Sequence, residues 1–384
     1  MNIPPNPLKG ERKKSPMNEA STNTNDLPIT PFRQPSEAKV GNEKERSSAE
    51  VRGVLVTGGT GFLGAYILRE LVEKGFRVRA IRRGTTLPFF IPNDILTRVE
   101  WIQGDILDIA GLEEAMDGVD SIVHAAAKVS FSKKDRHELF QTNVEGTANM
   151  VNIALEKKIR RFVYISSVSA LGRSKAEEKV TEEREWEEGR LNTNYAISKF
   201  RGEMEVWRGM SEGLQAVIVN PTTILGFGDW HQTSCAIFRS VFREFPWYTE
   251  GVNGFVDVGD TARAVVRLLA TDLVGQRYIL NGDNWSYRKL FGEIAAGFDK
   301  KPPSREATPF LAGIAWRIER IKSIFSGRPT LLTRESARVA QSRTSFDNTK
   351  VLEALPGFSF TPLETSVREA CRLYLNSISK SRPS

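Results

Sequence analysis

The sequence predicts an α/β fold in which a doubly wound parallel sheet carries a smaller, mainly helical C-terminal lobe. Three observations predict it: short apolar runs alternate with stretches of helical spacing up to Asn220, a glycine-rich turn follows the first run, and helical patterns continue after the alternation weakens. Strands that alternate with helices form right-handed βαβ units, which place their strands in one parallel sheet.

Six short segments are expected to be strands: residues 53–56, an apolar run, 76–81, where Val78 and Ala80 alternate with Arg77 and Arg79, and 99–103, 120–123, 161–165 and 216–219. Helical spacing covers residues 62–74, where Gly75 ends the helix, and a long stretch at about 135–157. Beyond Asn220, one more strand is expected at 277–280, and helices are expected at 261–270, 287–296 and 365–375.

Composition limits the class of protein. The chain has 384 residues, 40% hydrophobic and 26% charged, as in an ordinary soluble globular protein. No apolar run approaches the roughly 18 residues that span a bilayer. The formal net charge is +7, but Lys and Arg are interspersed with Asp and Glu, so neither nucleic acid nor a membrane is expected as a partner. Two cysteines and three scattered histidines predict neither a disulfide framework nor a metal site.

The glycine-rich turn joins the first strand to the first helix, and Gly58, Gly61 and Gly64 follow the pattern G-x-x-G-x-x-G. The first glycine permits a sharp turn, the second lets the backbone approach a pyrophosphate, and the third lets the helix pack against the sheet. The pyrophosphate would lie at the helix N-terminus, where free N–H groups favour anions. The turn therefore predicts a Rossmann-type domain that binds a nicotinamide dinucleotide through Gly58, Thr60, Gly61, Phe62, Leu63 and Gly64.

The end of the second strand bears on the choice between NAD and NADP. An acidic residue at this position binds the ribose 2′-hydroxyl of NAD and repels a 2′-phosphate. This strand ends instead in Arg82 and Arg83, whose guanidinium groups suit a 2′-phosphate. We therefore expect NADP rather than NAD, with a solvated basic surface as the alternative explanation of the two arginines.

Two more strand ends are expected to border the cofactor. Asp105 follows the third strand, together with Ile106, and its carboxylate can accept a hydrogen bond from the adenine amino group. Small residues at the end of the fourth strand let the backbone run along the cofactor; they are Ala125, Ala126 and Ala127. We interpret His124, which precedes them, as structural rather than catalytic.

Tyr195 and Lys199 lie four residues apart, which places them on one face of a helix. A free phenol has a pKa near ~10 and is a poor acid–base catalyst at neutral pH. A nearby ammonium group and the positive nicotinamide ring stabilise the phenolate and lower that pKa. Tyr195 can then exchange a proton with a substrate oxygen while hydride moves at the nicotinamide C4, and Lys199 can hydrogen-bond the ribose hydroxyls.

Serines follow the fifth strand in the segment Ser166-Ser167-Val168-Ser169. A serine hydroxyl at the carboxyl end of a strand can polarise the same substrate oxygen as Tyr195, because active sites of open α/β sheets lie at that edge. The spacing alone does not identify which serine acts.

Eight segments resemble, in order, the extended short-chain dehydrogenase/reductases, the NAD-dependent epimerase/dehydratase family. They are residues 57–64, 104–106, 124–127, 143–147, 165–167, 195–199, 220–226 and 255–262. Any one segment would be weak, whereas the ordered set, which covers about residues 51–226 and one later segment, is specific. The arginine after the second strand resembles the dihydroflavonol 4-reductase and cinnamoyl-CoA reductase-like members.

The resemblance implies a role for each matching residue. Tyr195 would be the acid/base and Lys199 its partner, while Ser167 would be the catalytic hydroxyl, since it lies five residues before Gly172. Asn143 would stabilise the active-site helix. Further contacts with the cofactor are implied for Ser166, Pro221, Thr222 and Thr223.

We therefore expect an NAD(P)-dependent oxidoreductase that transfers hydride between the nicotinamide and a carbonyl or secondary alcohol of a fairly apolar small molecule. Aromatic residues between Phe227 and Tyr248 would line its pocket or, alternatively, form the core of the lobe. The family also implies two other activities, a nucleotide-sugar 4-epimerase or dehydratase with tightly held NAD, and a 3β-hydroxysteroid dehydrogenase-like alcohol oxidation. A cofactor-sensing regulator is the non-enzymatic alternative, against which Tyr195 and Lys199 argue.

The expected organisation has three parts. Residues 1–50 are rich in Pro, Asn, Ser, Lys and Glu and are expected to be a disordered extension. Residues 51–226 would bind NAD(P), and residues 227–384 would form the substrate-binding lobe, with a segment near 255–280 returning to the sheet. A cytoplasmic location is expected from the few cysteines and the absence of an apolar signal segment. A homodimer through residues 135–157 and the Tyr195 helix would be typical of the resemblance.

Overall fold

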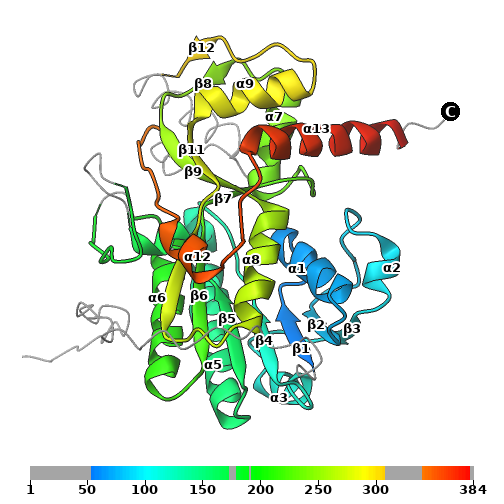
Figure 1. The fold of residues 1–384 in the computed structure, drawn as a ribbon, viewed down its shortest axis with the longest axis vertical. Helices are drawn as coiled ribbons and strands as arrows, with labels where there is room; N and C mark the ends of the chain where they lie inside the picture. The colour runs from blue at the N-terminus through cyan, green and yellow to red at the C-terminus, as the bar shows by residue number, and fades with distance from the viewer. Residues whose placement is uncertain (1–52, 173–178, 190–191, 308–339, 381–384) are drawn as a thin grey trace, which may run out of the picture. The chain divides into compact units, whose positions relative to one another are not determined.

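The computed structural model describes residues 53–172, 179–189, 192–307 and 340–380 (Figure 1). They contain a seven-stranded sheet with the order β10-β6-β5-β4-β1-β2-β3, in which every neighbouring pair is parallel. The strands are β1 (Val54–Thr57), β2 (Val78–Arg82), β3 (Glu100–Gln103), β4 (Ser121–His124), β5 (Arg161–Ile165), β6 (Ala216–Pro221) and β10 (Gln276–Leu280). This confirms the predicted doubly wound parallel sheet. The expectation for residues 1–50 lies outside the described residues.

Helices cover both faces of the sheet (Figure 1). One face packs against α1 (Phe62–Glu73), α2 (Asn93–Leu96), α8 (Val258–Ala270) and α12 (Thr349–Ala354). The other packs against α3 (Ile109–Ala115), α5 (Gly146–Glu156) and α6 (Asn194–Ser211). Successive strand residues enter opposite cores, as Val54 and Val56 do on one side and Leu55 on the other. This double burial explains the continuous apolar runs of central strands such as β1 and β6, whereas the edge strand β3 is partly exposed.

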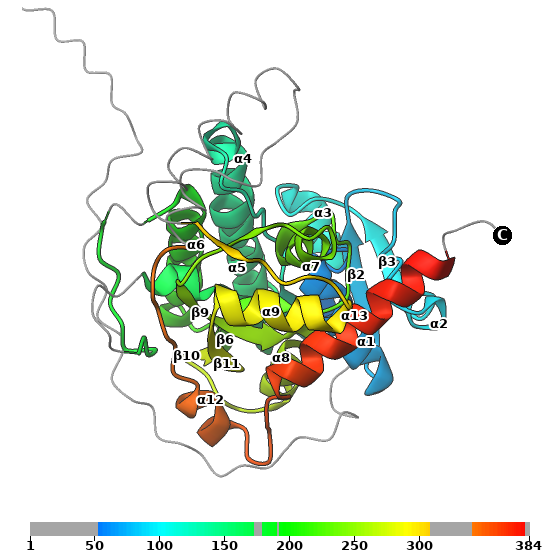
Figure 2. The ribbon, with the colours of Figure 1, turned by 90° about the horizontal axis from the view of Figure 1, so that it is seen from above.

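The C-terminal lobe has its own apolar core, which confirms the predicted mainly helical lobe. Its helices are α7 (Ala236–Phe242), α9 (Tyr287–Gly297) and α13 (Leu363–Lys380). Two small sheets join them, made of β7 (Thr223–Leu225), β9 (Val252–Asp257) and β11 (Asp283–Ser286), and of β8 (Trp247–Tyr248) and β12 (Arg305–Glu306). Figure 2 shows α9 and α13 side by side in this lobe. Among the described helices, none combines the length and the apolar character that a membrane crossing requires.

The aromatic residues of the lobe pack around Tyr374 on α13. The Trp230 ring stacks on the Tyr374 ring with centroids 5.4 Å apart, Phe227 meets it edge-on at 4.9 Å, and Phe238 is fully buried beside it. These contacts favour the second of the two expectations for this segment. Phe227, Trp230, Phe238 and Phe242 belong to the core of the lobe, whereas Phe245 is exposed.

The chain returns from the lobe to the large sheet twice. The first return begins at Val258, where α8 packs on the sheet, and it ends in β10 beside β6. The second is α12, whose Val351 joins the core under α1 and α8. The sequence did not predict the second return, because one short helix carries too little periodicity to indicate what it packs against.

The predicted helix at about 135–157 is not regular along its length. It consists of α4 (Arg136–Phe140), a π-helical turn η3 (Gln141–Glu145) and α5. Gly202 of α6 packs directly against this wide turn, since a Cβ atom there would lie 2.3 Å from the carbonyl oxygen of Asn143. The widened turn and the glycine thus bring α6 close to the segment that carries Asn143.

A buried hydrogen-bonded chain links β1, β4 and α5 around His124. Its Nδ1 lies 2.6 Å from Thr57 Oγ1, and its Nε2 lies 3.1 Å from Thr147 Oγ1. The Thr147 hydroxyl donates to the carbonyl oxygen of Asn143, so it accepts from Nε2–H. Burial lowers the pKa of His124 to about 3, and the charge of Lys199 adds to this effect. The neutral imidazole therefore serves a structural role here.

The close packing at Gly202 makes a prediction about stability. Gly202→Ala would place its Cβ 2.3 Å from a backbone oxygen and 2.7 Å from Tyr164 Oη, so the helix must shift. We expect the free energy of unfolding in urea to fall by about 1–3 kcal/mol. Gly292→Ala in α9 is the matched control, because its Cβ meets nothing within 4 Å, and a gain of about 0.5–1 kcal/mol is expected. Equal effects of the two substitutions would contradict the packing described.

The neutral state of His124 makes a prediction about pH. Its pKa in the folded protein is about 3 against 6.5 for the free side chain. Between these values the unfolded chain binds a proton that the folded chain does not, so stability falls as the pH falls. From pH 7.5 to 5.5 this costs about 1.4 kcal/mol. We expect His124→Asn to reduce the acid-induced loss of unfolding free energy by that amount, whereas the exposed His137→Asn should leave it unchanged. An unchanged pH dependence in His124→Asn would show that this imidazole titrates normally.

Candidate active site

The glycine-rich turn places the N-terminus of α1 at the carboxyl end of β1. Gly58 has φ +71°, and a Cβ there would lie 2.7 Å from the backbone of Ala125 and Ala126. A Cβ at Gly64 would lie 2.1 Å from the carbonyl oxygen of Gly58, so only glycine lets α1 start this close to the turn. Gly61 is the N-cap residue, and no side chain caps the first turn. An uncapped helix start in this tight backbone cradle fits a pyrophosphate group.

The basic residues at the end of β2 differ in their surroundings. The Arg82 guanidinium lies over the Trp101 ring, 5.7 Å from its centroid, and donates to the carbonyl oxygen of Thr85. The Arg83 side chain is 68% exposed, and its Nη1 lies 3.9 Å from Asp105 Oδ2. The predicted cofactor residues Arg83 and Asp105 therefore meet at one end of the sheet. Ile106 is instead buried in the core, beneath Gly146 of α5.

Tyr195 and Ser167 meet at the carboxyl edge of β5. Tyr195 is the second residue of α6, whose first turn is capped by Thr193 through a 3.0 Å bond from the Ala196 N–H. Ser167, which caps the following 3₁₀ turn η4 (Val168–Leu171), lies close enough to the Tyr195 phenol to affect its pKa. Burial raises the pKa of Tyr195, and Ser167 lowers it. The Phe131 ring meets the phenol edge-on at 6.0 Å.

Lys199 is buried one helical turn beyond Tyr195. Its Nζ donates to Tyr164 Oη at 2.9 Å and to the Ile165 carbonyl oxygen at 2.8 Å. Burial lowers the pKa of Lys199 to about 7, and the Glu203 carboxylate opposes this effect. These two bonds, within the described part of the chain, leave one of the three ammonium N–H groups for a ligand.

The sequence predicts that Lys199 and the positive nicotinamide ring together lower the pKa of Tyr195. Among the protein groups, burial raises this pKa and Ser167 opposes the effect. The Lys199 ammonium group is directed toward the Tyr164 hydroxyl and the Ile165 carbonyl oxygen, to both of which it donates.

Asn143 holds the loop that follows β4 onto α6. Its Oδ1 accepts from the Lys128 N–H at 2.7 Å, and its Nδ2 donates to the Lys128 carbonyl oxygen and to Ser198 Oγ, both at 2.9 Å. A single buried amide thus fixes a loop that carries Phe131 against the helix that carries Tyr195. The sequence predicts that Asn143 stabilises the active-site helix, and its bond to Ser198 is the contact with that helix.

Other predicted residues use their side chains within the protein. The Ser166 hydroxyl donates to Glu203 Oε2 at 2.7 Å, so it is directed into the core. The Thr222 hydroxyl donates to the Leu280 carbonyl oxygen at 3.1 Å, and Thr223 Oγ1 accepts from Asn253 at 2.8 Å. Pro221 is buried at the end of β6. Within the described residues, a cofactor would therefore meet Ser166 and Thr222 through their backbones.

The sequence reasoning missed Glu203, Tyr164 and Phe131. Glu203 lies four residues after Lys199, so the spacing of Tyr195, Lys199 and Glu203 along one helix face was an available signal. Tyr164 precedes the serine segment but looks like an ordinary strand residue. Phe131 lies in a loop, where no periodicity indicates the direction of a side chain. Among the described residues, no three His, Cys, Asp or Glu side chains gather as a metal site would require.

Comparisons with known proteins agree with this arrangement. The model of the NAD dependent epimerase/dehydratase family matches residues 54–280. A Synechocystis sp. protein named as a dihydroflavonol 4-reductase is 30% identical over 331 residues, which cover 84% of this chain and 94% of that protein. Sterol demethylase protein B of Methylococcus capsulatus is 34% identical over 288 residues, which cover 72% of this chain and 84% of that protein.

Solved structures share the fold. The crystal structure of gox2253 has a TM-score of 0.71 and 28% identity, and the match covers 85% of this chain and 98% of that chain. The chain therefore belongs to the NAD dependent epimerase/dehydratase family of extended short-chain dehydrogenase/reductases, and it is an NAD(P)-dependent oxidoreductase.

Proposed function

We propose that this enzyme reduces a carbonyl group of a fairly apolar small molecule with NADPH, using Tyr195 as the proton donor. The observation that carries the proposal is that Tyr195 and Ser167 come together at the carboxyl edge of β5, where Ser167 lowers the pKa of the phenol, with Lys199 one turn away. The uncapped start of α1 lies at the same edge, and its glycine-rich turn fits the pyrophosphate of a dinucleotide. In open α/β sheets, ligands bind at this edge.

Each residue has a distinct role in the proposed reaction. When bound, the cofactor supplies the hydride that reduces the carbonyl carbon. The phenol of Tyr195 gives its proton to the carbonyl oxygen, and the Ser167 hydroxyl donates a hydrogen bond to the same oxygen. The free N–H of Lys199 binds a ribose hydroxyl and orients the nicotinamide end. Because burial raises the pKa of Tyr195, the phenol stays protonated at neutral pH, which suits proton donation and thus reduction.

An apolar substrate is supported by the surroundings of the phenol. Phe131 lies edge-on to Tyr195, and Val129 on the same loop is an exposed apolar side chain. The loop is held in place by the Asn143 bonds to Lys128. The similar proteins named for dihydroflavonol and sterol chemistry are consistent with a substrate of apolar rings.

NADPH is proposed over NADH because two arginines, and no acid, end β2. The exposed Arg83 pairs with Asp105 at 3.9 Å and presents its guanidinium to solvent, where it can meet a 2′-phosphate, whereas Arg82 lies over Trp101. We expect Arg83→Ser to weaken NADPH binding by roughly tenfold, the value of one exposed charge-assisted hydrogen bond, and to leave NADH binding unchanged. Arg77→Ser is the control, since this exposed arginine precedes the opposite end of β2. Fluorescence titration at fixed ionic strength measures both affinities, and tighter binding of NADH by the wild type would refute the assignment.

Tyr195→Phe tests the reaction itself. Removing the phenolic oxygen removes the proton donor, so we expect kcat to fall by roughly 10²–10⁴-fold while the Kd for NADPH stays the same. NADPH oxidation is followed with a panel of apolar carbonyl compounds: benzaldehyde, cyclohexanone and 2-tetralone. Tyr248→Phe, at a half-exposed position in the lobe, is the control. Turnover that survives in Tyr195→Phe would exclude the mechanism, and conversion of a UDP-sugar without NADPH consumption would indicate an epimerase instead.

A further inference from the structure

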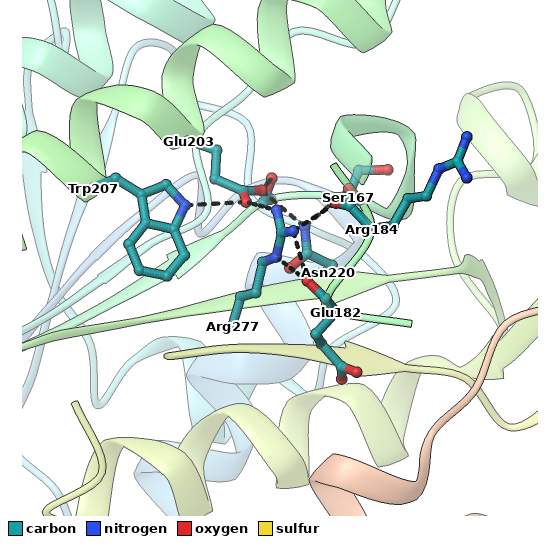
Figure 3. Close-up of polar contacts among 8 residues, drawn as sticks. Ser167, Glu182, Arg184, Glu203, Trp207, Asn220 and Arg277 are labelled. Carbon is teal, nitrogen blue, oxygen red and sulfur yellow. Dashed lines mark hydrogen bonds and ion pairs between the residues drawn. The ribbon is translucent and has the colours of Figure 1, made fainter. Parts of the chain in front are cut away.

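A buried carboxylate lies directly behind the Ser167–Tyr195 pair. Glu203 follows Lys199 by one turn on α6 and is fully buried. Its Oε2 accepts from Ser166 Oγ at 2.7 Å and from Asn220 Nδ2 at 2.9 Å. Its Oε1 accepts from Arg277 Nη1 at 3.0 Å, and Trp207 Nε1 lies 3.4 Å from the same atom (Figure 3). Four donors, from the residue after β5 and from β6, β10 and α6, thus converge on one side chain.

Arg277 is the counter-ion of Glu203 and is buried in β10. Three of its four remaining N–H donors are also used: Nε and Nη2 donate to the Glu182 carbonyl oxygen at 2.8 and 2.6 Å, and Nη2 donates to the Arg184 carbonyl oxygen at 2.8 Å. Transferring two charges from water to the interior is costly, and a buried pair is tolerated when its other hydrogen-bonding groups are satisfied. Such a pair is weak evidence for a gain in stability, and its hydrogen bonds here reach Ser166 and Asn220 beside the adjacent site.

Asn220 connects this ion pair to Ser167. Its Nδ2 donates both to Glu203 Oε2 and to the Ser167 carbonyl oxygen, the latter at 3.1 Å (Figure 3). The Ser167 backbone is therefore held by an amide that the Glu203 carboxylate orients. Ser166, the preceding residue, is held directly by the same carboxylate.

We infer that Glu203 is a positioning residue for the proposed reduction, acting through Asn220 and Ser166 to fix Ser167 relative to Tyr195. Glu203 and Tyr195 lie on one helix, so a carboxylate that binds the end of β5 sets the separation between the helix and the serine segment. The inference rests on the proposed function. In this view the buried ion pair contributes to folding and also sets the position of the Ser167 hydroxyl.

A double-mutant cycle with Ser167 separates positioning from stability. We expect Glu203→Gln to lower kcat by roughly tenfold or more in the wild-type background, because small displacements of a reacting group are costly. In the Ser167→Ala background, the same substitution should change kcat by less than about twofold, because the group it positions is gone. The carbonyl compound is whichever of benzaldehyde, cyclohexanone or 2-tetralone turns over, at saturating NADPH. Glu205→Gln is the matched control, since Glu205 lies on the same helix and pairs at the surface with Arg208.

Folding is monitored by Tm and by the Kd for NADPH in every variant. If Glu203→Gln does not fold, because it leaves Arg277 charged and buried, Asn220→Ala takes its place and removes the link to Ser167 without uncovering a charge. Equal loss of kcat in both backgrounds would contradict the inference, because a purely structural defect acts regardless of Ser167. Unchanged kcat in Glu203→Gln or its replacement would also contradict it. A Ser167→Ala enzyme as active as the wild type would instead overturn the proposed function.

Discussion

The ion pair between Glu203 and Arg277 is the interaction on which the geometry of the site depends. It joins α6 to the last strand of the sheet, and the same carboxylate holds the end of β5 and a residue of β6. These elements are far apart in the sequence, so hydrophobic packing alone would leave their relative positions free to adjust. Directional bonds to a buried charge fix them, because an unpaired charge in this interior would be strongly destabilising.

Burial sets the charges of the other groups at this edge. It lowers the pKa of His124 to about 3 and that of Lys199 to about 7, and it raises the pKa of Tyr195. All three effects favour the neutral forms, so the site is poised with a protonated phenol. Glu203 opposes the effect on Lys199 and helps that side chain to retain an ammonium group. The same carboxylate therefore acts on both geometry and charge.

Much of the fold could be predicted from local patterns. Short apolar or alternating segments identified all seven strands of the large sheet. The expectation that Ser167 lies near Tyr195 came from the rule that active sites of open α/β sheets lie at the carboxyl edge. What could not be predicted depends on contacts between distant residues. The inward direction of Ser166 requires Glu203, the π-helical turn at Asn143 requires the close approach of Gly202, and the aromatic core of the lobe requires Tyr374 of α13.

The central claim is that one edge of the sheet brings the cofactor to the Tyr195 phenol. A crystal structure of the NADPH complex tests this claim most directly. The account predicts the pyrophosphate at the N-terminus of α1, the 2′-phosphate beside Arg83, and the nicotinamide ribose bonded to Lys199 Nζ, with the nicotinamide C4 facing the space above Tyr195 and Ser167. A nicotinamide ring that lies away from Tyr195, or a pyrophosphate bound elsewhere than the glycine-rich turn, would contradict it.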